Sequence, residues 1–367
     1  MKIFKSFLFK FNYSLLSISL LISQGCINLG PSMINENRNS YNSIIQRTND
    51  EQLLLNLVRL KFHETPLFLE IANVTSQHRF QANVNADATF PNSGFNIFEF
   101  GGGTEVSENP VITYAPLQGQ KFIQQFLAKI KLNSIYLLYK SGWTVDKVLR
   151  LCVEKMGPMD NAPNASGPTP KSAPIFEEFL MAANLFRKLE KANNFNIFIE
   201  EDSDSEKMVF KIPFPDKNSN YLGQLNKLFK KPVQNDKFSF RVSVNENIKS
   251  NLDIETRSLL GVLYYLSHAI ETTKENIESG YVVVTLNNEG KPFLWGDVTG
   301  DLLKIYSQIK EPSQASIKIL YDGHWYFVKK SDLNSKSTFS FLAQIFFLQA
   351  GNFDRSAPLI TIPIGNN

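Results

Sequence analysis

The stretch Phe80-Gln81-Ala82-Asn83-Val84-Asn85-Ala86-Asp87-Ala88-Thr89-Phe90 alternates apolar and polar residues without a break. Because successive side chains of a β-strand point to opposite faces, this alternation predicts a strand with one apolar and one polar face. A turn-forming segment at 91–94 and a second, glycine-rich alternating run at 98–106 follow it. Together they predict a long β-hairpin over residues 80–107, in which the glycines at 101–103 mark a bulge or the close approach of another backbone.

Helices are predicted on both sides of the hairpin, where apolar residues recur at spacings of three and four. The first begins at Thr48-Asn49-Asp50-Glu51 and ends at Pro66. A helical block at 118–131, 133–139 and 144–156 follows the hairpin, with Thr144 as the cap of its third helix and Gly157-Pro158 as the stop. Further helices are predicted at 175–193, 256–270 and 335–350, the last of them capped by Ser or Thr.

Strand signals dominate the second half of the chain. The strongest is Asp322-Gly323 between the runs 316–321 and 324–329, because both central residues of a tight hairpin turn must tolerate positive φ. Other strands are predicted at 196–200, 207–212, 237–245, 281–286, 293–295 and 359–364. Since strands and helices do not alternate regularly, we predict an α+β fold with a long N-terminal β-hairpin, a central helical block and C-terminal mixed strands and helices.

The first 26 residues indicate where the protein works. Three lysines precede an apolar run at 11–22, and Ser23-Gln24-Gly25-Cys26 follows it. Positive, apolar and small residues in that order are typical of a secretory signal peptide. The ending resembles the lipobox of bacterial lipoproteins, which implies cleavage before Cys26 and attachment of a diacylglycerol to its thiol. By the same analogy, Ile27 in place of Asp implies transfer to the outer membrane, facing the periplasm.

This interpretation of the N-terminus sets the domain organisation. Residues 1–25 form the signal peptide, and residues 26–47, rich in Asn and Ser, form a lipid-anchored tether. Residues 48–157 hold the first helix, the hairpin and the helical block, and residues 175–367 form an α+β C-terminal region. The proline-rich segment 158–174 is predicted to be a connecting loop between them.

Composition excludes some classes of function. The chain has 38 Lys and Arg against 35 Asp and Glu, and removing residues 1–25 takes away three lysines and no acid, which leaves 35 against 35. A neutral body has no electrostatic footprint for nucleic acid. Hydrophobic residues make up 43% of the chain, enough to bury a sizeable core. The chain has two cysteines, and if Cys26 carries the lipid, Cys152 has no partner for a disulfide bond. Cys152 is predicted to be a buried apolar residue.

The sequence offers no catalytic constellation. The four histidines lack a second ligand at a recognised metal spacing, and the usual nucleophile motifs are not found. We therefore expect no metal, no cofactor and no catalytic residue. A candidate anion-binding or partner-binding spot combines Trp325 and Tyr326 with Lys336 at a helix start. Ordinary strand packing and a helix cap explain the same residues.

Short motifs are spread over the chain at Asn56-Leu57-Val58-Arg59-Leu60, Tyr114-Ala115-Pro116-Leu117-Gln118-Gly119, Ser141-Gly142-Trp143, 165–170 and 332–339. Through them the chain resembles a group of uncharacterised Gram-negative lipoproteins. The resemblance covers nearly the whole mature chain. It implies no activity, cofactor or catalytic residue.

These observations favour contact over catalysis. We expect an exported, membrane-anchored lipoprotein that acts as a structural or adaptor component of a cell-envelope assembly, with envelope proteins or further copies of itself as partners. In one alternative, the 80–107 hairpin enters the outer membrane as part of an oligomeric pore, because the 11 residues at 80–90 match the length of a tilted membrane strand. In the other, the protein is an exported hydrolase of envelope polymers.

The anchor assignment is tested by the variant Cys26→Ala. Without this thiol no diacylglycerol can be attached, so labelling with a radioactive fatty acid should fall to background and the protein should leave the membrane fraction. Cys152→Ala serves as the control and should keep the label. Persistent labelling of the Cys26→Ala protein would rule out lipidation at this site.

Overall fold

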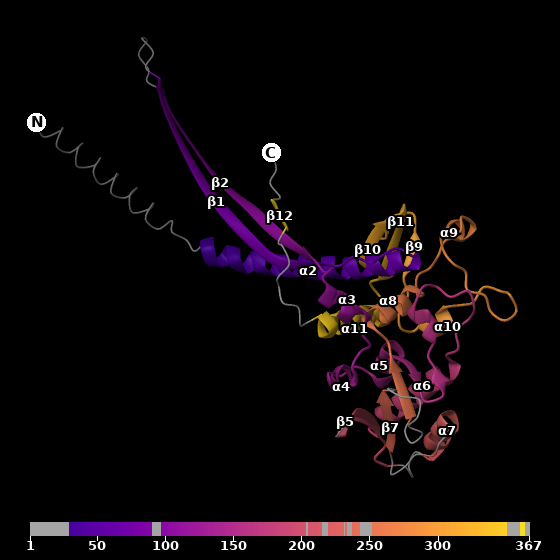
Figure 1. The fold of residues 1–367 in the computed structure, drawn as a ribbon. Helices are drawn as coiled ribbons and strands as arrows, with labels where there is room; N and C mark the ends of the chain where they lie inside the picture. Colours follow the sequence, from indigo (N-terminus) through magenta and orange to yellow (C-terminus); the bar gives the residue numbers. More distant parts are fainter. Residues whose placement is uncertain are drawn as a thin grey trace, which may run out of the picture. The chain divides into compact units, whose positions relative to one another are not determined.

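The computed structural model describes residues 29–89, 97–202, 205–214, 219–230, 232, 237–242, 252–350 and 360–363. The chain separates into two units, Met1–Leu53 and Leu54–Asn367. In the first unit, the described residues belong to helix α2 (Leu29–Lys61), which continues into the second. The second unit holds the other elements, arranged in three sheets with accompanying helices, and the fold is α+β (Figure 1).

Helix α2 begins earlier than the sequence predicts. The predicted start, Thr48, lies inside the helix, where its hydroxyl donates to the carbonyl of Ile45 at 3.0 Å. Threonine makes this bond within helices as well as at their ends, which is why the start signal is ambiguous. Pro31 falls in the first turn, where the missing N–H breaks no helical hydrogen bond. Most of the segment expected as a tether is therefore helical.

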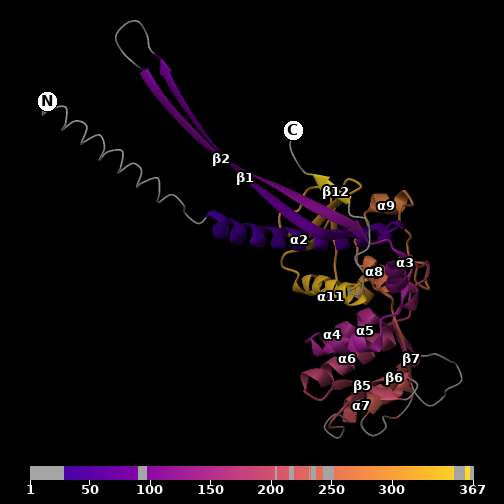
Figure 2. The same cartoon turned by 60° about the vertical axis from the view of Figure 1, so that its left-hand side comes forward.

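The predicted hairpin is present and is longer than the alternation alone indicates. Strands β1 (Leu69–Thr89) and β2 (Ile97–Pro116) pair antiparallel and run side by side in both views (Figures 1 and 2). The pairing passes through the glycine run without a shift in register, so the bulge expected there is wrong. The register shifts between Ile71 and Asn73 instead. The expected turn at 91–94 lies outside the described residues.

A third strand, β12 (Ile360–Pro363), joins the hairpin from the far end of the chain. It pairs antiparallel with β2, where Ile360 lies opposite Tyr114 and Pro363 lies opposite Val111. The strand order is β1-β2-β12, so β2 is central and β1 forms one edge. The last predicted strand is thereby confirmed, with ends one residue inside the expected ones.

The second sheet has six strands in the order β4-β3-β8-β7-β6-β5. Its strands are β3 (Val153–Met156), β4 (Met159–Asp160), β5 (Asn196–Asp202), β6 (Ser205–Lys211), β7 (Lys237–Val242) and β8 (Leu252–Thr256). Helices α4 (Leu132–Lys140), α5 (Val145–Cys152), α6 (Glu177–Lys191) and α7 (Ser219–Phe229) accompany it (Figure 2). The core is aromatic: the rings of Phe186, Phe195 and Phe210 lie 5.1 to 5.3 Å apart, centroid to centroid.

The third sheet has the order β10-β11-β9. Its strands are β9 (Tyr306–Gln308), β10 (Ala315–Tyr321) and β11 (His324–Lys329). The remaining described helices of the second unit are α3 (Gln120–Leu127), α8 (Leu259–Ser267), α9 (Lys274–Glu278), α10 (Gly296–Thr299) and α11 (Leu333–Ala350). The turn between β10 and β11 has φ of 45° at Asp322 and 73° at Gly323. Both residues of the predicted tight turn are therefore left-handed, as expected.

Three predicted elements are wrong because tertiary pairing overrides the local pattern. The helix expected at 144–156 ends at Cys152, whose carbonyl accepts a hydrogen bond from the Arg257 N–H, and the chain continues as strand β3. Residues 281–286 and 293–295 form no strand. Leu286 makes isolated bridges to Ser172 and Pro292 instead, so the segment 158–174 packs inside the second unit.

Two helix caps also differ from their predictions. Thr144 stands at the N-cap of α5, but its side chain makes no capping bond, and the Glu190 carboxylate accepts from the Val145 N–H at 3.3 Å. At the start of α11 the cap is Asp332, whose carboxylate accepts from the N–H of Ser335 at 3.0 Å and from its hydroxyl at 2.6 Å. A carboxylate also complements the positive end of the helix dipole.

The buried guanidinium of Arg257 connects the elements around α8. Its side chain is 0% exposed. Nη1 donates to the carbonyls of Arg150 and Val153 at 2.8 and 2.7 Å, Nη2 donates to the Asn161 carbonyl, and Nε donates to the Ser166 hydroxyl at 3.0 Å. Its neighbours are thus the ends of α5 and β3 and the 3-10 turn η1 (Pro163–Ser166).

Removing this guanidinium should destabilise the fold strongly. In Arg257→Met the buried Asn161 carbonyl loses its donor, and the carbonyls of Arg150 and Val153 keep only the bonds from the Asn161 side-chain amide at 2.9 and 2.7 Å. We therefore expect the free energy of unfolding to fall by about 3–5 kcal/mol. Lys237→Met is the control: it removes an ion pair to Glu200 between two partly exposed side chains and should cost less than about 1 kcal/mol. Urea denaturation measures both, and a similar small loss for the two variants would contradict the role assigned to Arg257.

Candidate functional site

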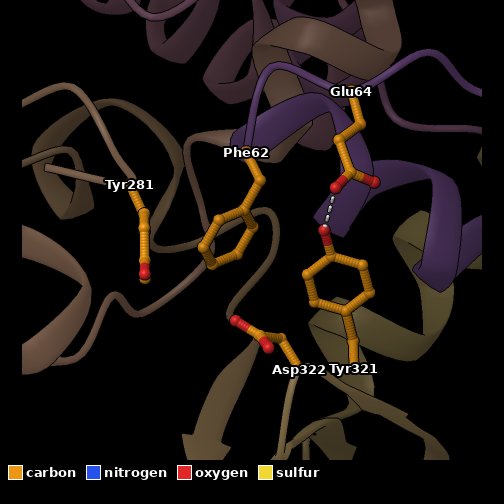
Figure 3. Close-up of a pocket in the computed structure, with 5 residues that line it drawn as sticks. All are labelled: Phe62, Glu64, Tyr281, Tyr321 and Asp322. Carbon is orange, nitrogen blue, oxygen red and sulfur yellow. Dashed lines mark hydrogen bonds between the residues drawn. The ribbon is translucent and has the colours of Figure 1, made fainter. Parts of the chain in front are cut away.

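A pocket of about 450 Å³ in the second unit is lined by Phe62, Glu64, Tyr281, Tyr321 and Asp322 (Figure 3). Three aromatic rings and two carboxylates thus come from three distant parts of the chain. None of the five lies on the regular part of a helix, and only Tyr321 lies in a strand. The pocket is built from the ends of elements, where the chain reverses.

Each reversal depends on left-handed backbone. After α2, His63 has φ of 62°, and the Glu64 N–H donates to the Arg59 carbonyl at 2.8 Å. After α9, Gly280 has φ of 71°, and the Tyr281 N–H donates to the Asn276 carbonyl at 3.0 Å. Both are helix ends of the Schellman type, in which a left-handed residue turns the chain across the last helical carbonyls.

The third reversal is the Asp322-Gly323 turn, which places Tyr321 and Asp322 against the end of α2. The Tyr321 hydroxyl donates to Glu64 Oε1 at 2.6 Å, and the rings of Tyr321 and Phe62 lie 5.3 Å apart. Burial raises the pKa of Tyr321, and its hydrogen bond to the negatively charged Glu64 raises it further. Tyr321 therefore stays a neutral donor and fixes the Glu64 carboxylate in place.

This arrangement suits a positively charged group. Figure 3 shows the Asp322 side chain turned toward the space beside Phe62 and Tyr281. The faces of aromatic rings carry negative electrostatic potential, and carboxylates add full negative charge. The end of α2 also contributes the partial negative charge of a helix C-terminus. Arg59 contributes a positive charge near Tyr321, where it lowers the pKa of that residue.

The predicted spot formed by Trp325, Tyr326 and Lys336 is only partly assembled. Tyr326 is buried, and its ring lies 6.3 Å from both Phe62 and Tyr321, so it supports the pocket from behind. Trp325 is stacked with Lys318, whose Nζ lies 5.6 Å from its ring centroid. Among the described contacts, none joins Lys336 to either ring. A binding spot formed by these three residues therefore stays a prediction.

The hydroxyls at the start of α11 are used inside the fold. Ser335 Oγ accepts from the Lys304 N–H at 2.9 Å, and the Thr338 hydroxyl donates to the Leu302 carbonyl at 2.6 Å. These bonds tie the helix to the turn before β9. The packing explanation for this segment is thus the one that the contacts support.

Of the two cysteines, the structure describes only Cys152. Cys152 is buried and free, and burial raises the pKa of its thiol to about 12, so it is the inert apolar residue that the sequence predicts. Cys26 lies outside the described residues, and its lipidation stays a prediction. Over the described ranges, no group of three or more His, Cys, Asp or Glu side chains could hold a metal ion. None of the helices described is long and apolar enough to cross a membrane.

Sequence reasoning identified none of the five pocket residues as a site residue, and treated Asp322 only as a turn former. The Asp322-Gly323 turn was recognised in the sequence, but nothing local connects it with Phe62, Glu64 or Tyr281. No protein-family model, curated protein or solved structure matches the chain. The pocket is therefore interpreted from its own geometry.

His268, the residue that follows α8, is a second unusual group and is buried. Its ring stacks on Trp295 with centroids 3.9 Å apart, and Nε2 donates to the Ala165 carbonyl at 3.3 Å. Nδ1 has no hydrogen-bond partner among the described residues. Burial, with the nearby charge of Lys61, holds the pKa of His268 well below its usual value. Burial also lowers the pKa of Lys61 to about 8.

The low pKa of His268 predicts a loss of stability in mild acid. Below about pH 6.5 the unfolded chain binds a proton that the folded chain refuses, so the free energy of unfolding should fall by up to about 1.4 kcal/mol per pH unit. His268→Phe keeps a ring against Trp295 and should reduce this slope in urea titrations between pH 7.5 and 5.5. Equal slopes in wild type and His268→Phe would contradict the assignment.

Proposed function

We propose that the protein is an exported, lipid-anchored structural or adaptor component of a cell-envelope assembly, and that it joins this assembly through the β1–β2 hairpin. The observation that carries the proposal is the unpaired outer edge of β1. The order β1-β2-β12 places this 21-residue strand at the edge of its sheet, and no described strand pairs with its other side. The signal-like segment ending at Cys26 supports export and anchoring.

The described residues give most of the hairpin no support beyond its own two strands. A two-stranded ribbon alone is marginally stable in water. The third strand pairs with β2 only between Val111 and Tyr114, so among the described residues the rest of the hairpin is two-stranded. Along the edge of β1 from Val74 to Thr89, every second residue presents an N–H and a C=O that no described strand pairs with. A strand contributed by another chain satisfies these groups.

The register supplies a further reason for a partner. It sets apolar residues opposite one another, pairing Phe80 with Val106, Ala86 with Phe100 and Ala88 with Phe98. The apolar pattern of β1 is therefore continued on β2. An extended segment of a partner that adds to the edge of this ribbon gains main-chain hydrogen bonds along it.

Adding charge to the hairpin should disrupt the assembly. Lysines on an edge strand oppose pairing with another strand, so the double variant Asn83→Lys/Asn85→Lys should weaken association at least about tenfold. The measurement is the mass of the native complex purified in mild detergent. Asn220→Lys/Gln224→Lys adds the same charge at a hydrogen-bonded, exposed pair on α7 and should leave the mass unchanged.

The same preparation tests the proposal as a whole. A wild-type monomer without any co-purifying partner would overturn it, and so would an assembly that the hairpin lysines leave intact. The pore alternative draws on the same hairpin, whose strands of 21 and 20 residues exceed the length that a membrane strand needs. Conductance of the reconstituted complex across a lipid bilayer would favour that alternative over an adaptor.

A further inference from the structure

We propose that the pocket lined by Phe62, Glu64, Tyr281, Tyr321 and Asp322 receives the guanidinium group of an arginine side chain presented by a partner protein. This inference goes beyond the proposed function. It does not rest on the hairpin, because none of the lining residues belongs to β1 or β2.

The Asp322 carboxylate is the group available to bind the guanidinium. No hydrogen bond or ion pair occupies its oxygens among the described contacts, whereas Glu64 Oε1 is engaged by the Tyr321 hydroxyl. A carboxylate with two free oxygens matches the parallel N–H groups of a guanidinium. Glu64 adds a second negative charge whose position Tyr321 fixes.

The aromatic rings supply the other half of the recognition. Tyr281 is 60% exposed and stands beside Phe62, so a flat cation entering the pocket meets ring faces as well as the carboxylate (Figure 3). Guanidinium groups stack on such faces, and the attraction grows as water is removed. The protein uses this contact in its own core, where the guanidinium of Arg257 lies 4.1 Å from the ring centroid of Tyr265.

The openness of the site favours a side chain over a free metabolite. Sites for small molecules enclose most of the surface of their ligand. Here Glu64, Tyr281 and Asp322 are all exposed, so a free ligand would stay largely in water. An arginine carried by a partner needs only its tip enclosed, because the surrounding interface supplies the remaining contacts. Its planar, forked shape also fits a carboxylate beside rings better than the compact ammonium of lysine does.

The test is titration of the full-length protein in mild detergent with the peptide acetyl-Gly-Arg-Gly-amide, followed by saturation-transfer NMR. Binding in the millimolar range is expected, as is usual for a single side chain. The matched citrulline peptide has the same shape without the charge and should bind at least about tenfold more weakly than the arginine peptide. The matched lysine peptide should bind about threefold more weakly.

Two variants locate the binding. Asp322→Asn removes the charge while Asn tolerates the left-handed φ of 45°, so the fold should persist and affinity for the arginine peptide should fall about tenfold. Tyr281→Leu keeps an apolar side chain but removes the ring, and should weaken binding about threefold. Asp253→Asn, which removes an exposed carboxylate on β8 outside the pocket, should change nothing.

Several outcomes would overturn the inference. These are no binding of the arginine peptide to wild type, equal binding of the citrulline peptide, or undiminished binding to Asp322→Asn. A lysine peptide that binds as tightly as the arginine peptide would assign the pocket to ammonium groups instead. Any of these results leaves the mass of the hairpin-dependent complex untouched, so failure here is distinguishable from failure of the proposed function.

Discussion

A buried cation without a carboxylate partner organises the second unit. Besides its side-chain bonds, Arg257 uses its backbone at the same place: its N–H donates to the Cys152 carbonyl at 2.8 Å, and its carbonyl accepts from the Ile130 N–H at 2.8 Å. A neighbouring buried arginine, Arg150, donates to both oxygens of Asp301 at 2.6 Å. A charge taken out of water is tolerated only when its donors are satisfied. Arg257 bonds to the ends of α5 and β3, and Arg150 donates to the Val298 carbonyl of α10 at 2.8 Å. These bonds therefore fix the six-stranded sheet, α5 and α10 in one arrangement.

Left-handed residues place the pocket in a comparable way. His63, Gly280 and the Asp322-Gly323 turn each reverse the chain within a few residues, and each leaves the side chains beside it at the surface. Such conformations cost a residue other than glycine free energy, so the surrounding hydrogen bonds must hold them. The Schellman bonds at two helix ends do so here. Because these hydrogen bonds already fix the turns that line the pocket, binding of a ligand there would cost the protein little conformational entropy.

How much was predictable depends on whether the decisive interaction is local. The Asp322-Gly323 turn, the long amphipathic α6 and the alternating hairpin were readable, because neighbours in sequence create those patterns. Strand β3 was not, since Val153 and Met156 also continue the apolar face of α5, and pairing with β4 and with the distant β8 selects the strand. The pocket was equally hidden, because its residues lie on three separate turns and no local pattern ties Phe62 to Tyr281.

The pairing of β12 with β2 has a consequence for the order of events during biosynthesis. The segment at Val111–Tyr114 is synthesised long before its partner at Ile360–Pro363, because most of the described elements lie between them in the sequence. Until then this part of the β2 edge stays open, and open edges invite pairing with other chains. Closing it requires a contact across most of the sequence, which is slow to form. Strand β12 thus closes this part of the edge only after the intervening elements have been made, and Pro363, which lacks an N–H, has no backbone donor to offer.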